Sequence, residues 1–177
     1  IASYHGINLS NTKNTVIDLN VFNSSTQTRR AINAYGSDSL TITNNEIINI
    51  DSGISIGSGA DSYLISGNII NDVNGGDAIT LPAYYNNNST YTNREVSQNQ
   101  IKNLKNGVGI NIGTNNVFVS NNFVHAAGTG VAKGIVNSGN NNRIVFNNVN
   151  VTSTDILFGS AFENNEGENL VLRNNIF

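Results

Sequence analysis

The stretch Val117-Phe118-Val119-Ser120-Asn121-Asn122-Phe123-Val124 places short apolar segments on both sides of an asparagine. The same arrangement returns throughout the chain, with an asparagine between two apolar segments in every copy. These asparagines are Asn20, Asn45, Asn68, Asn99, Asn122, Asn148 and Asn175, spaced 23 to 31 residues apart. A period of this length is typical of solenoids, in which one short unit stacks on the next. The chain is therefore predicted to be a stack of about seven copies of one unit.

A second motif precedes each of these asparagines: a small residue, then an apolar, a polar and an apolar residue. Six copies begin at Gly6, Ala31, Gly53, Ala78, Gly109 and Gly134, and a poorly matched seventh copy is Asp155-Ile156-Leu157-Phe158. Because successive side chains of a strand point to opposite faces, the two apolar residues are expected to point inward. Each unit thus contains three short strands, which we expect to pair in parallel with their copies in the next unit.

The asparagines are expected to stand at the bend between the second and third strands of each unit. Stacked strands lie about 4.8 Å apart, which lets each carboxamide donate a hydrogen bond to the amide of the next unit. Ladders of this kind stabilise stacked parallel strands. Chance placement in an asparagine-rich chain would not hold seven asparagines at one phase of the repeat. We therefore predict that they form a structural Asn ladder.

The composition fits an all-β chain that forms one domain over residues 1–177. Only 12% of the 177 residues are charged, and no window carries the apolar stripe of an amphipathic helix. The net charge of −3 gives no electrostatic reason to expect nucleic acid as a partner, and no apolar run is long enough for membrane insertion. The chain has no cysteine, which excludes disulfides and thiolate chemistry. We expect no metal and no cofactor.

The three-strand unit with its Asn ladder resembles the right-handed parallel β-helix of the pectate-lyase-like superfamily, and most of all the β-helix segments of bacteriophage tailspikes and tail appendages. The resemblance implies a single-stranded right-handed parallel β-helix (β-solenoid) of about seven coils. It also implies a polysaccharide or glycan partner, an extracellular or virion-tail location, and a homotrimer of the full-length protein. No capping helix is predicted at either end, so we expect a fragment of a longer β-helix.

One long segment interrupts the short turns of the repeat. It runs from Pro82 to Arg94 and contains Tyr84, Tyr85 and Tyr91. A tyrosine ring has an apolar face that stacks on sugars and a hydroxyl that bonds to them. These three tyrosines are candidate substrate-binding residues. The alternative is that the segment packs back on the rod as a small satellite core.

The register of the repeat brings ionisable residues together beside this segment. Asp51 and Asp77 are expected on neighbouring coils, and a close carboxylate pair is what glycosidases use. Arg30, one coil below, would hold an acidic sugar. We therefore predict Asp51, Asp77 and Arg30 as catalytic residues, with Arg29 and the outward-facing Asn111 in substrate binding. The alternative is a solvated rim of ordinary ion pairs.

Three classes of function remain open at this point. The first is a tailspike-type or appendage-type rod that binds, and in some cases depolymerises, a cell-surface or capsular polysaccharide. The second is a secreted bacterial lyase, hydrolase or epimerase that acts on a uronic-acid polymer. The third is a passive structural or adhesin solenoid. Common enzyme signatures of the superfamily, such as Gly-His-Gly and Asp-Asp, do not occur in the sequence, which favours the first class.

Overall fold

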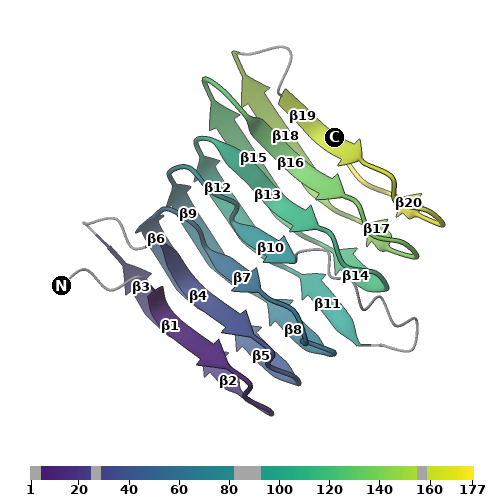
Figure 1. Cartoon of the computed structure of the whole chain (residues 1–177). Coiled ribbons are helices and arrows are strands. Elements are labelled where there is room, and N and C mark those ends of the chain that lie inside the picture. The colour runs from purple at the N-terminus through teal and green to yellow at the C-terminus, as the bar shows by residue number, and fades with distance from the viewer. Residues whose placement is uncertain (1–4, 25–28, 82–92, 155–158) are drawn as a thin grey trace.

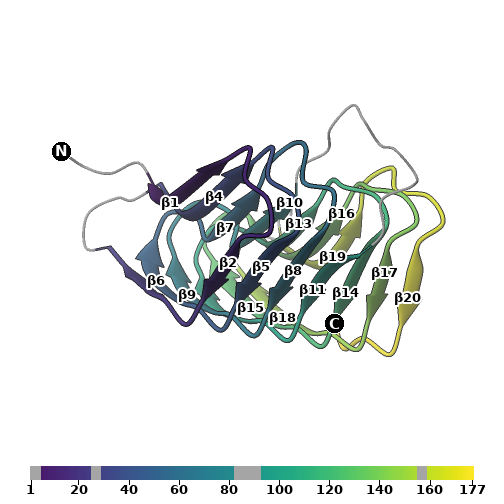
Figure 2. The same cartoon turned by 90° about the horizontal axis from the view of Figure 1, so that it is seen from below.

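A computed structural model describes residues 5–24, 29–81, 93–154 and 159–177. These residues form strands β1 to β20 and contain no helix. The strands stack in order along a rod, from β1 at one end to β19 and β20 at the other (Figure 1). Seen from below, each coil repeats the outline of the coil before it (Figure 2).

The strands belong to three parallel sheets, and each coil contributes one strand to each sheet, except that the last described coil (β19 and β20) adds none to the third. The first sheet contains β1 (His5–Ser10), β4 (Arg30–Tyr35), β7 (Ile54–Ile56), β10 (Ile79–Leu81), β13 (Gly107–Ile112), β16 (Ala132–Asn137) and β19 (Gly159–Asn164). The second contains β2 (Val16–Asp18), β5 (Leu40–Thr43), β8 (Tyr63–Ser66), β11 (Arg94–Ser97), β14 (Val117–Ser120), β17 (Arg143–Val145) and β20 (Val171–Arg173). The third contains β3 (Val21–Asn23), β6 (Glu46–Ile50), β9 (Ile69–Val73), β12 (Gln100–Leu104), β15 (Phe123–Gly128) and β18 (Asn148–Ser153).

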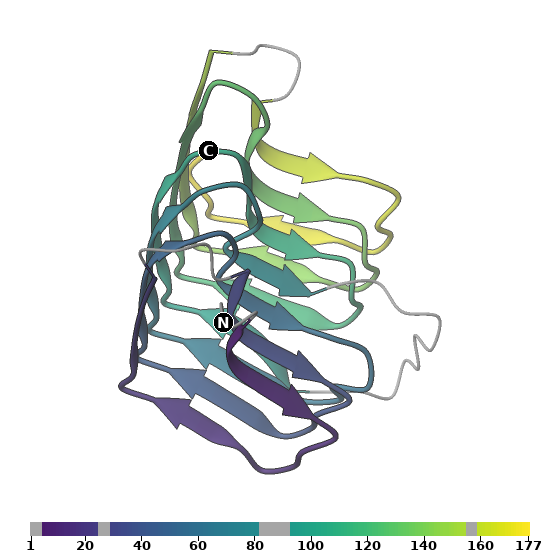
Figure 3. The same cartoon turned by 60° about the vertical axis from the view of Figure 1, so that its left-hand side comes forward.

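The three sheets surround the interior of the rod (Figure 3). Apolar side chains fill this interior in columns that run along the rod. On β4, Ile32 and Ala34 are fully buried while Asn33 between them is partly exposed. The register pairs Ile32 with Ile54 and Ile54 with Ile79, so that like residues stack in the same column. A single coil cannot close such a core, and its stability comes from the coils on both sides. The predicted all-β parallel solenoid is confirmed.

The predicted Asn ladder is confirmed, with six of its seven predicted members in place. Its members are Asn20, Asn45, Asn68, Asn99, Asn122, Asn147 and Asn175. Each Nδ2 donates to the Oδ1 of the next member at 2.9 to 3.1 Å. The backbone N–H of a member donates to the same Oδ1 of the next member. Asn68 N, for example, lies 3.0 Å from Asn99 Oδ1. The ladder therefore satisfies buried backbone and side-chain groups together.

Two details of the sequence prediction are wrong. The sixth member of the ladder is Asn147, which is buried, rather than Asn148, which is exposed on β18. The seventh copy of the first strand was predicted at residues 155–158, but the last strand of the first sheet is β19, where Phe162 pairs with Ile135. The copy predicted at residues 155–158 lies outside the described residues. With seven strands in two sheets and six in the third, the rod completes about six turns.

Candidate functional site

The outer face of the first sheet carries two columns of side chains that leave the core. The residue that follows the core Ile or Phe of each strand forms one column: Asn8, Asn33, Ser55, Thr80, Asn111, Val136 and Glu163. The residue two positions before the core Ile or Phe forms the other: His5, Arg30, Ser52, Asp77, Val108, Lys133 and Ser160. Most members are polar, so this face presents donors and acceptors along the rod.

A shallow groove of about 410 Å³ opens on this face, across β1, β4 and β7. It is lined by Asn8, Leu9, Ser10, Arg30, Asn33, Tyr35, Ser55 and Gly57. The Tyr35 side chain is 54% exposed. Asn33 Nδ2 donates to Asn8 Oδ1 at 2.7 Å, which fixes the two carboxamides side by side. The groove therefore combines an exposed aromatic ring with a row of fixed polar groups.

Arg30 gives this groove a positive charge. Within the described part of the chain, the only ion pair is that of Lys133 with Glu163, so Arg30 has no carboxylate partner there. Its half-buried side chain lies opposite His5 in the register. Burial and the positive charges of Arg30 and Arg29 lower the pKa of His5 below its usual value. Arg30 is the charged residue among those that line the groove.

The predicted pair of aspartates lies on neighbouring coils. The Gly76 N–H donates to the Asp51 carbonyl at 2.9 Å, and the Gly53 N–H donates to the Asp77 carbonyl at 3.1 Å. Both side chains are partly exposed. The two backbones are therefore adjacent, as the prediction requires, and a catalytic role for the pair stays a prediction.

The Asp77 carboxylate has a structural role. Its Oδ1 accepts from the Val108 N–H at 3.0 Å, and its Oδ2 accepts from Asn111 Nδ2 at 2.9 Å and from Thr80 Oγ1 at 3.2 Å. These hydrogen bonds join β10 to the start of β13 after the segment that separates them. Asn111, predicted to bind substrate, is thus a direct partner of Asp77.

At the other end of the same face, Lys133 Nζ and Glu163 Oε2 form an ion pair at 2.6 Å. Asn165 Nδ2 and Ser160 Oγ also donate to the Glu163 carboxylate. The hydrogen bonds from Lys133 and Asn165, together with the Lys133 charge, outweigh burial and lower the pKa of Glu163. This end is therefore neutralised internally, unlike the groove around Arg30.

Sequence reasoning missed four residues that line the groove: Asn8, Asn33, Tyr35 and Ser55. The outward column was visible in the sequence, but the groove depends on side-chain shape and on Tyr35, three residues after the core Ile32. Tyr84, Tyr85 and Tyr91 lie outside the described residues. Arg29 is described and exposed, next to β4. Among the described residues, no group of three or more His, Cys, Asp or Glu side chains is placed to hold a metal ion.

No protein-family model matches this chain, and no curated protein or solved structure matches it either. The described residues also include no helix that is long and apolar enough to cross a membrane. No related protein therefore assigns a role to any residue of this chain, and the geometry of the site is the basis for each role proposed below.

Proposed function

We propose that this chain is a glycan-binding β-helix that holds a polysaccharide against the outer face of the first sheet. The observation that carries the proposal is the groove in which Tyr35, Arg30 and the hydrogen-bonded Asn8–Asn33 pair lie together. Sites for sugars need a flat apolar surface and several polar groups at fixed positions. This groove offers both, on rigid strands rather than on a loop.

Each part of the groove has a chemical task in this proposal. The Tyr35 ring, 54% exposed, supplies a face for the C–H side of a sugar ring. The guanidinium of Arg30 presents several donors in one plane, which suits a carboxylate or a pair of neighbouring hydroxyls. The carboxamides of Asn8 and Asn33 provide both donors and acceptors. Because like positions repeat in each coil, a chain of sugars would run along the rod axis.

Cleavage of the bound glycan by Asp51 and Asp77 is a second candidate function. It is favoured by the adjacent backbones of these residues on neighbouring coils, with Asp51 just before β7 and Asp77 just before β10. Asp77 already accepts three hydrogen bonds, which favours binding as the primary function. In this proposal, replacing either aspartate with asparagine abolishes release of reducing ends while the glycan still binds.

A rod that binds surface polysaccharide fits the setting of a phage tailspike or tail appendage, outside the cell or on a virion tail. A homotrimer of a longer protein would belong to that setting. A secreted enzyme on a uronic-acid polymer is the competing setting, and the same groove would serve it. These settings are proposals that follow from the glycan-binding function.

The experiment is a binding screen against bacterial capsular and plant acidic polysaccharides, followed by calorimetry on any that bind. Tyr35→Ala and Arg30→Gln are expected to weaken binding about tenfold or more, roughly 1.4 kcal/mol, without lowering the melting temperature. Arg143→Gln is the matched control, because Arg143 is exposed on the second sheet over the Phe118 ring, away from the groove. Wild-type affinity in both groove variants, or no binding to any polysaccharide, would overturn the proposal.

A further inference from the structure

The sequence contains an asparagine followed by a glycine twice, as Asn74-Gly75 and Asn106-Gly107. In such a pair the backbone nitrogen of the glycine can attack the asparagine side chain, because glycine has no side chain to shield it. Both pairs lie where the chain passes from the third sheet to the first, one coil apart. Both asparagines are exposed. The two pairs therefore differ mainly in the backbone around the glycine.

The backbone N–H of Gly75 has no acceptor among the described residues. The chain is anchored on both sides of it. The Asn74 N–H donates to the Ile50 carbonyl at 3.0 Å, and the Gly76 N–H donates to the Asp51 carbonyl at 2.9 Å. Apart from the two chain neighbours of Gly75, no atom lies within 4 Å of the position that a Cβ would take there. The nitrogen of Gly75 is therefore accessible and lies outside the hydrogen-bond ladder.

The backbone of Gly107 is held much more firmly. Its N–H donates to the Val131 carbonyl at 2.7 Å, and the residue pairs with Ala132 in the first sheet. Its φ of 131° lies in a region that glycine adopts readily and other residues rarely do. The Gly107 nitrogen must therefore leave its hydrogen bond before it can react with Asn106.

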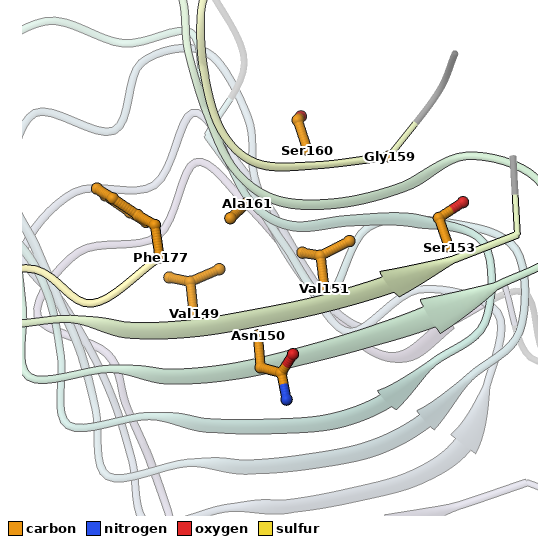
Figure 4. A pocket seen from close by; sticks show the side chains of 8 residues that line it. All are labelled: Val149, Asn150, Val151, Ser153, Gly159, Ser160, Ala161 and Phe177. Carbon is orange, nitrogen blue, oxygen red and sulfur yellow. The ribbon is translucent and has the colours of Figure 1, made fainter. Parts of the chain in front are cut away.

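Exposure alone does not make an asparagine reactive in this way. Figure 4 shows Asn150 on β18, on the opposite side of the strand from Val149 and Val151, which line a groove of about 370 Å³. Asn150 is exposed, but the residue after it is Val151, whose branched side chain crowds its own backbone nitrogen. Asn74 is the one described asparagine that combines exposure, a following glycine and a glycine nitrogen without an acceptor.

We propose that Asn74 is a site of spontaneous deamidation. The Gly75 nitrogen loses its proton to water and attacks Cγ of Asn74. A C–N bond forms, the bond between Cγ and Nδ2 breaks, and Nδ2 takes up a proton and leaves as ammonia. The product is a five-membered succinimide ring. Water opens this ring at Cγ to give aspartate, or at the backbone carbonyl carbon to give isoaspartate, and is the only co-reactant.

The reaction places a new carboxylate between two charged residues. The register puts residue 74 beside Asp51 of the coil before it, because the Asn74 N–H donates to the Ile50 carbonyl. It puts residue 74 beside Lys105 of the coil after it, because the Lys105 N–H donates to the Val73 carbonyl at 3.1 Å. The net charge of the chain becomes one unit more negative than −3. The isoaspartate product also lengthens the backbone of this turn.

The test compares the two pairs in the folded and in the unfolded chain. The protein is kept at mildly alkaline pH with and without urea, and peptide mapping by mass spectrometry measures the conversion of amide to acid at each site. In the folded chain, Asn74 is expected to react about tenfold faster than Asn106 or more, which corresponds to about 1.4 kcal/mol in the activation free energy. In urea the two rates should become similar, because the Gly107 hydrogen bond is lost.

Gly75→Val tests the attacking atom. The branched side chain shields the nitrogen of residue 75, and the open space around Gly75 accommodates it, so the conversion of Asn74 should fall about tenfold or more while that of Asn106 stays unchanged. A thermal melt verifies that the variant is folded. Four results would overturn the proposal: an intact Asn74 in the aged folded chain, equal rates at the two sites in the folded chain, a rate difference that persists in urea, or an unchanged rate at Asn74 in Gly75→Val.

Discussion

Asparagine side chains pair with one another in two regions of this rod, in the buried ladder and on the outer face of the first sheet. Losing a partner has a different cost in each region. In the ladder, Asn99 is 1% exposed, and its carboxamide serves the coil before and the coil after it. On the outer face of the first sheet, Asn33 donates to Asn8 in an exposed pair with water on one side. A buried amide without partners is costly, whereas an exposed amide exchanges its partner for water.

The difference shows how a repeat separates stability from function. Residues that point inward must satisfy the same neighbours in every coil, and the ladder therefore keeps one residue type from Asn20 to Asn175. Residues that point outward have no such constraint, and the outer column changes from Asn8 and Asn33 to Val136 and Glu163. Variation on the outer face is what allows one part of the rod to form a binding groove.

The largest effect is expected for Asn99→Ala. This change removes the acceptor for the N–H and Nδ2 of Asn68 and the donor to the Ile65 carbonyl. Each buried group left unsatisfied costs roughly 1–3 kcal/mol, so we expect a loss of about 3 kcal/mol or more. Urea denaturation measures it, and a midpoint equal to that of the wild type would contradict the structural role of the ladder.

A smaller effect is expected for Gly134→Ala, which adds one methyl group where strands and core meet. A Cβ at Gly134 would clash with Val149 Cγ1 and with the Ala161 carbonyl. Overpacking of this kind costs about 1–3 kcal/mol. Gly75→Ala is the matched control, because nothing lies within 4 Å of its Cβ, and its stability should stay equal or rise slightly. Equal melting temperatures for both variants would show that the core around Gly134 has room for a methyl group.

The Lys133–Glu163 pair should contribute a pH-dependent term of about 0.2–1 kcal/mol, typical of partly exposed ion pairs. The pKa of Glu163 is lower in the folded chain than its usual value. Its contribution is therefore complete above the usual glutamate pKa and is lost as the pH falls through the lowered pKa. Glu163→Gln should lower stability at pH 7 and reduce its decline in acid. If the stability of the variant has the same pH dependence as that of the wild type, the ion pair does not contribute to stability.

The smallest change in stability is expected for Asn33→Ala, at most about 0.5 kcal/mol, because the residue it leaves unpaired is exposed. Its effect on glycan affinity should be larger than its effect on the melting temperature. Calorimetry beside a thermal melt separates the two quantities. A strong loss of stability with unchanged affinity would place Asn33 with the ladder rather than with the groove.

Much of the fold was predictable because inward positions repeat at a fixed phase. The error at Asn148 shows the limit of that argument. In Asn44-Asn45 and Asn121-Asn122 the first asparagine has a positive φ and the second enters the ladder. At the sixth bend Phe146 takes the place of the first asparagine, with φ 57° where Asn121 has φ 54°. The residue after Phe146, Asn147, therefore enters the ladder. Counting three residues from the inward Ile144, as from Ile42 to Asn45, would have given Asn147.

The site was less predictable than the fold for a physical reason. The position of Asp77 beside Asn111 follows from register, but its three hydrogen bonds depend on the turn before β13. The groove around Tyr35 depends on which outward side chains are large and which are small, and no repeat constrains these choices. Sequence periodicity therefore indicates the face on which a site lies and leaves its composition to the structure.

The central claim is that the buried asparagines act as one connected ladder, and a double-mutant cycle on Asn68 and Asn99 tests it most directly. Asn68 Nδ2 donates to Asn99 Oδ1 at 3.0 Å, so replacing either residue with alanine leaves groups of the other without a partner. We expect the double variant to lose less stability than the sum of the two single variants, with a coupling of about 0.5–3 kcal/mol. Additive losses would show that the two asparagines act independently and would contradict the ladder.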